Sequence, residues 1–213
     1  MGRPTLFRFL PGFFLLGLPI PDALAIEEAC VTPPGGLVGW WPAEADGTDL
    51  AGGPGGTLVG AGFDAGEVGQ GFRFNGPGQG VDVPVSQALL PPDLSVEAWV
   101  RRDRTDRIAG DAGNRAWVFA LGAGGFGLGL QPDGHLTFAR MDGEEVAADA
   151  APISDVDLHH VAVTVGLGEV RFYVDGQPAG LGRINPFFEI GDTASIGRRP
   201  DTGAGSFLGL IDE

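Results

Sequence analysis

The chain has no lysine, and it has only one cysteine and three histidines among its 213 residues. The single Cys30 excludes an internal disulfide, so its thiol pairs with another chain, pairs with residues outside this sequence, or stays free. Structural zinc sites usually combine cysteine with histidine. One cysteine and the distant His135 cannot complete such a set around the neighbouring His159 and His160, so a zinc site is excluded.

Positive charge is scarce as well. Thirteen arginines face 28 acidic residues, which gives a net charge of -15. Binding to phosphate groups needs clustered cations, so this balance disfavours nucleic acid and anionic membranes as partners. The same acidity suits divalent cations, but many extracellular proteins are acidic for solubility, and we favour that simpler reading.

Long helical patterns are missing. No stretch keeps a helical period over three turns, and no internal repeat of fixed length is present. The 38 glycines and 17 prolines lack a collagen-like period, and both residues destabilise helix interiors. Short alternating stretches separated by turn signals therefore predict an all-β fold, an antiparallel sandwich or barrel.

The clearest strand is predicted at 94–101, where Leu94, Val96, Ala98 and Val100 share one face. Further strands are predicted at 37–41, 71–76, 81–85, 115–122, 126–131 and 135–143. Turn signals stand at Pro132-Asp133-Gly134, Asp142-Gly143 and Asp175-Gly176, because Asp-Gly readily supplies the positive backbone angles of tight hairpins.

His159 and His160 open a predicted hairpin at 160–174. Successive side chains of a strand point to opposite faces, so this pair cannot easily hold one metal ion together. The alternation of Val161, Val163 and Val165 favours structural histidines over catalytic ones. We expect one of the two to form a hydrogen bond at the strand entrance.

Residues 1–25 have the pattern of a secretory signal peptide. Arg3 and Arg8 precede an apolar stretch, and Ala23-Leu24-Ala25 is a small-x-small cleavage site. The apolar stretch is too short, and too broken by proline, for a membrane span. We therefore expect a linker at 26–35, a domain at 36–213, and a secreted or cell-surface location with no membrane span after cleavage.

Several stretches, taken in order, carry a resemblance. They read "LVGWWPAEADGTDLAGGPGGTLVG", "GEVGQGFRFNG", "LSVEAWVRRD", "LHHVAVTVGLGEVRFYVDGQPAG" and "ASIGRRPDTGAGSFLGLIDE". Their order resembles bacterial laminin-G-like domains of the concanavalin A-like lectin and glucanase superfamily. The resemblance implies an antiparallel jelly-roll sandwich of two sheets over 36–213. Such domains bind glycans, mediate cell adhesion or contact extracellular proteins, mostly as non-catalytic modules of larger proteins.

The resemblance also implies two features near the C-terminal end. The family continues after Gly-x-Ile-Asp-Glu with a hydrophobic strand, so we expect the domain to lack its last strand or to take it from elsewhere. In related sandwiches a structural calcium ion joins an N-terminal loop to an acid on the C-terminal strand. Here the metal ligands would be Asp49, Gly52, Gly53 and Asp212. The alternative is that Asp46 and Asp49 cap turns.

Catalytic residues are not predicted. The glucanase relatives place two carboxylates on one strand, as retaining chemistry requires, whereas Glu97 stands between Ser95 and Trp99. We expect a non-catalytic module that binds a glycan or a surface protein. The alternatives are an atypical glycoside-hydrolase-related domain and a structural spacer. Trp40, Trp41, Trp99 and Trp117 are aromatic candidates for sugar contact or packing, and loops 103–114 and 198–206 are candidate contact surfaces.

Overall fold

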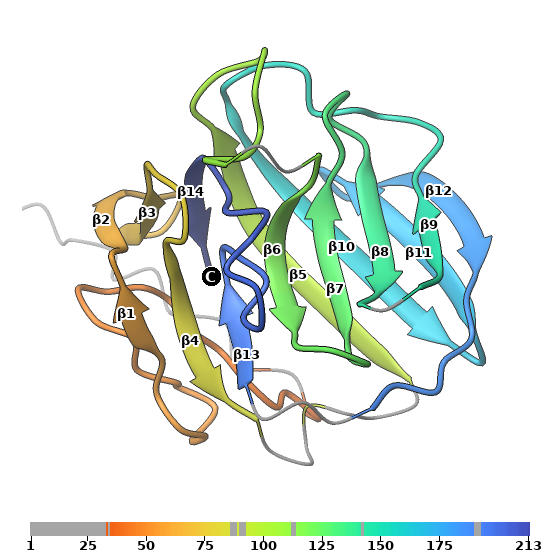
Figure 1. The fold of residues 1–213 in the computed structure, drawn as a ribbon, viewed down its shortest axis with the longest axis horizontal. Helices are drawn as coiled ribbons and strands as arrows, with labels where there is room; N and C mark the ends of the chain where they lie inside the picture. Colours follow the sequence, from red (N-terminus) through yellow and green to blue (C-terminus); the bar gives the residue numbers. More distant parts are fainter. Residues whose placement is uncertain are drawn as a thin grey trace, which may run out of the picture. The chain divides into compact units, whose positions relative to one another are not determined.

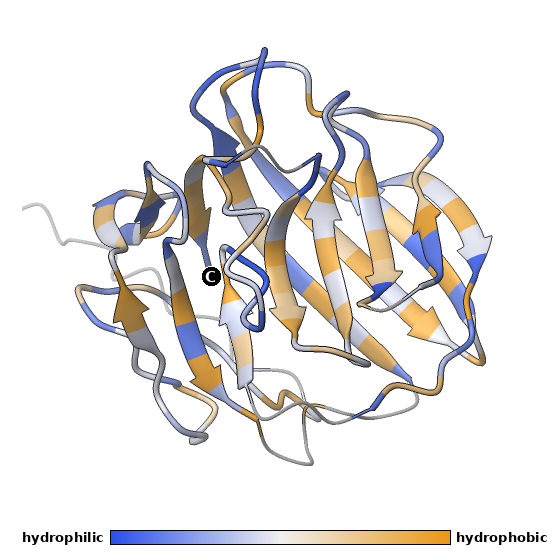
Figure 2. Cartoon of the chain, viewed as in Figure 1, coloured by the Kyte–Doolittle hydropathy of each residue, from blue (hydrophilic) through white to orange (hydrophobic). Residues whose placement is uncertain are grey.

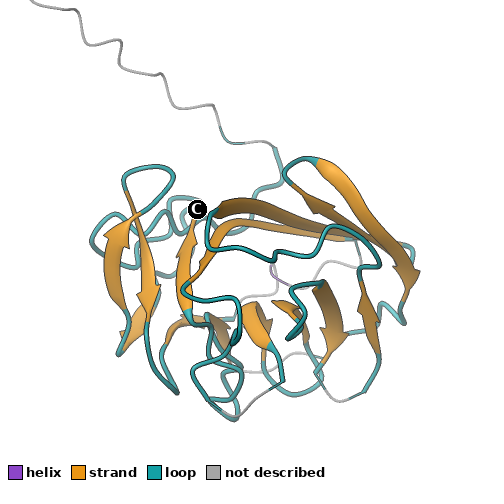
Figure 3. Cartoon of the chain, turned by 90° about the horizontal axis from the view of Figure 1, so that it is seen from above, coloured by secondary structure: helices purple, strands orange, loops and turns teal. Residues whose placement is uncertain are grey.

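The structure is a computed structural model that describes residue 33 and residues 35–213, except for 86–88, 90–92, 112–113, 142 and 190–192. The expected signal peptide, Cys30 and most of the expected linker lie outside these described residues. A compact unit covers Gly35–Glu213. Its described residues form strands and loops, without a helix long and apolar enough to cross a membrane (Figure 3).

Two antiparallel sheets of seven strands form the unit, one behind the other (Figure 1). We call the one with the shorter inner strands the first sheet. In spatial order it contains β1 (Thr57–Val59), β4 (Gly80–Pro84), β13 (Thr193–Ile196), β6 (Ala116–Leu121), β7 (Phe126–Leu130), β8 (Leu136–Arg140) and β9 (Glu145–Ala147).

The second sheet contains the two longest strands, β5 and β10, at its centre. In spatial order it consists of β12 (Gln177–Arg183), β11 (Glu169–Val174), β10 (Leu158–Gly166), β5 (Leu94–Arg102), β14 (Gly209–Asp212), β3 (Gln70–Phe74) and β2 (Gly62–Ala65). Neighbours in both sheets are often distant in sequence, as expected for a jelly roll. The prediction of an all-β sandwich of two antiparallel sheets is confirmed.

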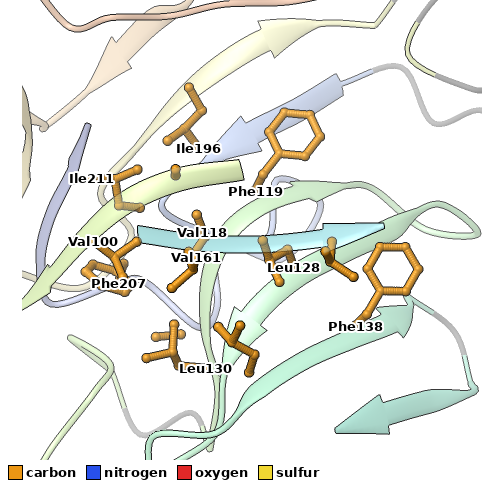
Figure 4. Packing of buried hydrophobic residues seen from close by; sticks show 14 of the residues in the cluster. Val100, Val118, Phe119, Leu128, Leu130, Phe138, Val161, Ile196, Phe207 and Ile211 are labelled. Carbon is orange, nitrogen blue, oxygen red and sulfur yellow. The ribbon is translucent and has the colours of Figure 1, made fainter. Parts of the chain in front are cut away.

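Alternating apolar side chains build the core between the sheets. On β10, Val161, Val163 and Val165 are at most 2% exposed, and the residues between them lie on the outer face. Figure 2 shows this as alternating bands along the strands. In Figure 4 the core-facing side chains of both sheets meet, among them Val100 and Val161 from the second sheet and Leu128 and Phe138 from the first.

Two tight hairpins frame β11. The β10–β11 turn consists of Leu167 and Gly168, and the β11–β12 turn consists of Asp175 and Gly176. All four residues have positive φ, which is the geometry of a type I′ turn. The hairpin predicted at Asp175-Gly176 is confirmed, as is the turn at 132–134. The one at Asp142-Gly143 falls partly outside the described residues.

The strand predicted at 37–41 was wrong, because the segment pairs with no strand of the described chain. The backbone of Trp40 explains why. Its N–H donates to Asp49 Oδ1 at 2.8 Å, and its carbonyl accepts a bond from Leu50 N–H at 2.8 Å. Both backbone groups are thus engaged by the loop that follows, and none is left for a sheet neighbour.

β14 lies inside the second sheet, between β5 and β3. Its pairing with β5 runs from Gly209 opposite Arg102 to Asp212 opposite Trp99. β10 instead pairs with β5 as far as Leu94. Within the described chain, residues 94–98 of β5 therefore have a ladder partner on one side only. The prediction of a further strand after Glu213 stays a prediction.

Candidate functional site

The outer face of the first sheet carries its own small apolar cluster. Trp117, Ala120, Ala139 and Met141 are all at most 7% exposed and form a group separate from the main core. They come from β6 and β8 and from the residue that follows β8. An apolar cluster on the outer side of a sheet needs a cover, and here Gly205 lies against Trp117, since a Cβ on it would be 2.6 Å from Trp117 Cδ1.

Glycines on β7 make room for the indole of Trp117. A Cβ on Gly129 would lie 3.0 Å from Trp117 Cε3, and one on Gly127 would lie 2.9 Å from the same atom. Any side chain at these positions would displace the ring. In β7, glycine alternates with Phe126, Leu128 and Leu130, because the apolar residues fill the core and the glycines leave room for Trp117.

A small open pocket lies beside this cluster, with a volume of about 130 Å³. It lies where β6 begins, β8 ends and β9 begins, below the loop between β13 and β14. The residues that give it chemical character are Arg115, Arg140, Arg199, Glu145, Trp117 and Met141. Arg115 and Arg199 line it together with one indole and one thioether, whereas Arg140 stands opposite the core-facing Phe126 in the β7–β8 pairing.

Arg115 is held in place by Glu145. Its Nε donates to Glu145 Oε1 at 2.8 Å, and its Nη2 donates to Oε2 of the same carboxylate. Gln131 and Thr137 also donate to Glu145 Oε1, at 3.1 and 2.6 Å. Burial acts to raise the pKa of Glu145, but the bonds from Arg115, Thr137 and Gln131 outweigh it and lower the pKa. This carboxylate is therefore ionised, and its oxygens are occupied by protein donors.

Arg199, on the loop between β13 and β14, is also oriented by a bidentate pair with a carboxylate. Its Nε and Nη2 donate to the two carboxylate oxygens of Asp201 at 2.6 and 2.8 Å. The loop that carries it is pinned to the sheet, since Gly197 N–H donates to Val118 O and Trp117 N–H donates to Gly205 O. Bidentate pairs of this kind fix the orientation of the guanidinium plane.

The two loops expected to be contact surfaces lie together. Leu208 N–H donates to Ile108 O at 3.0 Å, and Gly110 N–H donates to Ser206 O at 2.7 Å. Only the second loop reaches the pocket, through Arg199. The first turns its arginines elsewhere, with Arg107 donating to the carbonyls of Ala109 and Gly110.

Asp49, one of the predicted calcium ligands, accepts three backbone bonds. Its Oδ1 accepts from Trp40 N–H and Ala51 N–H, both at 2.8 Å, and its Oδ2 accepts from Gly53 N–H at 3.1 Å. The side chain is buried, with 7% exposed. Gly52 N–H donates to the Asp49 carbonyl at 3.2 Å. Asp49, Gly52 and Gly53 thus form one capped turn, which is the alternative that the sequence left open, and Asp46 caps a turn at Thr48 as well.

Asp212, the fourth predicted ligand, lies on β14 and is fully buried. Its Oδ2 accepts from Glu67 N–H at 2.8 Å and Val68 N–H at 3.1 Å, and its Oδ1 accepts from Glu213 N–H at 2.9 Å. Burial is the main cause that raises the pKa of Asp212, against the lowering effect of these backbone bonds. The carboxylate therefore anchors the β2–β3 turn to β14.

These contacts give Asp49 and Asp212 roles in the fold without a cation. The carboxylates face N–H groups, whereas a calcium cage offers oxygen ligands. Within the described residues, no three His, Cys, Asp or Glu side chains are grouped to hold a metal ion. The calcium site stays a prediction, and a titration has to test it.

The histidine pair lies at the entrance of β10, as expected. His159 bridges two carboxylates, with Nδ1 2.8 Å from Asp175 Oδ2 and Nε2 2.8 Å from Asp155 Oδ1. His160 packs its ring against Trp99, with centroids 5.3 Å apart. The prediction of a histidine hydrogen bond at the strand entrance is confirmed. The predicted opposite facing of the two side chains also fits these separate partners.

Of the four tryptophans, only Trp117 lines the pocket. Trp41 packs on the main core and stacks with Phe119, with centroids 6.2 Å apart. Trp40 donates from Nε1 to Glu213 Oε2 at 2.7 Å. Trp99 lies on the outer face of the second sheet, next to Glu97, whose side chain is 70% exposed.

The sequence did not point to Arg115, Arg140, Met141 or Glu145. Arg115 and Arg199 are far apart in the chain, and the strand order that joins them cannot be read from periodicity. One signal was present. Arg115 and Trp117 are two residues apart at the start of a strand, so they share its face.

The two sheets and their strand order define a jelly-roll sandwich. The sequence profile of the concanavalin A-like lectin/glucanases superfamily matches residues 75–213. The chain belongs to this superfamily, and the expected resemblance is confirmed. No curated protein sequence matches it significantly.

Solved structures with a similar fold include domain 4 of AbnA, an extracellular GH43 arabinanase from Geobacillus stearothermophilus, solved in complex with arabinotriose. It shares 22% identity with a TM-score of 0.58, over 79% of this chain and 84% of that one. The CBM40 of the Ruminococcus gnavus IT-sialidase shares 14% identity with a TM-score of 0.52, over 67% and 86%. Trypanosoma rangeli sialidase shares 21% identity with a TM-score of 0.58, over 84% of this chain but only 30% of that enzyme.

Proposed function

We propose that this chain is a non-catalytic, extracytoplasmic carbohydrate-binding module whose glycan site is the arginine-lined pocket on the first sheet. The observation that carries the proposal is a small pocket that is lined by Arg115 and Arg199 beside Trp117 and Met141. Ligand sites combine apolar surface with a few oriented polar groups, and arginine is a rigid, multiple donor. Sugars offer both kinds of partner, with apolar ring faces and many acceptor oxygens.

Similar solved domains support this class of function by analogy of fold. The AbnA domain was solved with arabinotriose, and the R. gnavus domain is a carbohydrate-binding module of a sialidase. Both are parts of larger carbohydrate-processing enzymes. By analogy, this chain is proposed to work beside other domains, outside the cytoplasm, as its predicted signal peptide also favours.

The carboxylates around the pocket favour binding over hydrolysis. Glycoside hydrolysis uses two carboxyl groups, about 5 to 9.5 Å apart, on either side of the scissile bond. Among the residues that line the pocket, Glu145 is the single acid, and protein donors occupy its oxygens. Glu97 lies on the other sheet.

A glycan array, followed by calorimetry on each glycan that is captured, tests the proposal. We expect the purified chain to bind at least one oligosaccharide, and Arg199→Gln to weaken that binding about tenfold, as expected for one lost charged hydrogen-bond pair. Arg171→Gln is the matched control, because Arg171 lies on β11 of the second sheet and pairs with Glu169. Equal weakening by both variants, or no bound glycan at all, would contradict the proposal.

A further inference from the structure

The residues that line the pocket are richer in arginine than the chain as a whole. The whole sequence has 13 arginines against 28 acids, whereas the residues that line the pocket include three arginines and one glutamate, with Asp201 paired to Arg199 beside them. A neutral sugar needs hydrogen-bond donors and acceptors but no net charge. Arginine side chains gathered in one small pocket of an acidic protein fit a ligand that carries negative charge, because the repulsion of the molecule as a whole would otherwise keep such a ligand away.

The two acids next to the arginines orient the guanidinium planes. Glu145 and Asp201 each bind one Nε–Nη2 edge, of Arg115 and Arg199 respectively. A guanidinium has five N–H donors, so one carboxylate leaves the far edge available. Among the described residues, the Nη1 group of Arg115 donates only to Asn114 Oδ1, at 3.2 Å. Within the described part of the chain, the bonds of Arg199 leave its Nη1 unused.

The size of the pocket limits what enters it. Its volume of about 130 Å³ is below the roughly 300 to 1,000 Å³ of pockets that enclose a whole small ligand. One planar substituent and part of the ring that bears it fit this space. The remainder of an oligosaccharide would lie outside the pocket, across the outer face of the sheet.

We infer that the pocket recognises the carboxylate of an acidic sugar, with the far edges of Arg115 and Arg199 as its donors. This inference rests on the proposed carbohydrate-binding function and specifies its ligand. Planar forks of arginine match a carboxylate in a bidentate way, which a point charge does not. Uronic acids and sialic acids share this chemistry, so the test includes both.

Calorimetry with matched acidic and neutral probes tests the inference. One pair is trigalacturonic acid and its methyl ester, and the other is sialyllactose and lactose. We expect one acidic probe to bind at least tenfold more tightly than its neutral partner, as expected for one charged bidentate contact. The affinity should fall as the salt concentration rises, since the pocket is partly open to solvent.

Variants separate a charge effect from loss of folding. Arg199→Gln should reduce binding of the acidic probe about tenfold and leave binding of its neutral partner unchanged, and Arg199→Lys should give an intermediate loss. Arg171→Gln, on the second sheet, should change neither, and thermal midpoints should confirm that all variants fold. Equal binding of acidic and neutral probes would overturn the inference and leave the carbohydrate-binding function standing. No binding of any glycan, on the array or here, would overturn both.

Discussion

At the scale of the residue, the two tight turns show how the residue type at one position determines backbone strain. Leu167 and Asp175 occupy the first position of equivalent turns, with φ of 51° and 50°. Asp tolerates this region, whereas a leucine there is strained. Leu167 is also 89% exposed, so packing does not compensate for the strain.

Leu167→Asn should therefore stabilise the domain, by about 0.5–1 kcal/mol. Urea denaturation followed by tryptophan fluorescence measures the change. Leu167→Ala is the control, since alanine also removes the exposed apolar surface but keeps a Cβ at positive φ. Equal stabilisation by alanine and asparagine would assign the effect to surface hydrophobicity and contradict the strain argument.

His159 makes stability depend on pH. Burial acts to lower the pKa of His159, but the bonds with Asp175 and Asp155 outweigh burial and raise it above its usual value of 6.5. A raised folded-state pKa means that protonation favours the folded chain. This stabilisation is complete below about pH 6.5 and is lost as the pH rises through the raised value.

His159→Gln should accordingly cost more stability at pH 6 than at pH 8.5. Denaturation curves of the variant and the native chain at both pH values give the difference. His160→Gln serves as the control, because His160 faces Trp99 and lies 3.8 Å from Glu97. A cost for His159→Gln that is the same at both pH values would refute the charged role of the imidazole.

At the scale of the element, Arg102 joins the end of β5 to two loops. It is 2% exposed, and its Nη2 donates to Thr105 O at 2.9 Å while Nη1 donates to Ile153 O. Burial is the main cause that lowers the pKa of Arg102. Removal of the guanidinium would leave both carbonyls without their partner.

Arg102→Met should reduce the free energy of unfolding by about 2–4 kcal/mol, because buried acceptors would stay unsatisfied. The comparison is Arg101→Met on the same strand. Arg101 is 30% exposed and lies 3.5 Å from Asp64, so its loss should cost less than about 1 kcal/mol. Equal costs would show that the loop contacts of Arg102 contribute nothing measurable.

Asp212 connects β14 to the β2–β3 turn, and its substitution tests the calcium prediction. Asp212→Ala should destabilise the chain by about 1–3 kcal/mol even with a chelator, because it frees the N–H groups of Glu67 and Val68. If calcium also binds here, millimolar calcium should raise the thermal midpoint of the native chain and not that of the variant. No shift in the native chain would remove the calcium site.

At the scale of the whole molecule, the sandwich could be predicted because the alternation of apolar residues is visible within the sequence of a single strand. The alternation of Val161, Val163 and Val165 needs no information from elsewhere in the chain. The segment 37–41 is also apolar, yet it forms no strand, because strand formation needs a partner and Trp40 bonds to Asp49 and Leu50 instead. The pocket could not be predicted, since Arg115, Arg140 and Arg199 meet only through the strand order and the covering loop.

The central claim is that this domain binds a glycan on the outer face of its first sheet. Chemical-shift mapping tests it most directly, by titration of the isotope-labelled chain with the tightest-binding glycan from the array. The account predicts shifts confined to residues around Arg115, Trp117, Arg140 and Arg199. Shifts centred on Trp99 and Tyr173 of the second sheet, or no shifts for any glycan, would contradict it.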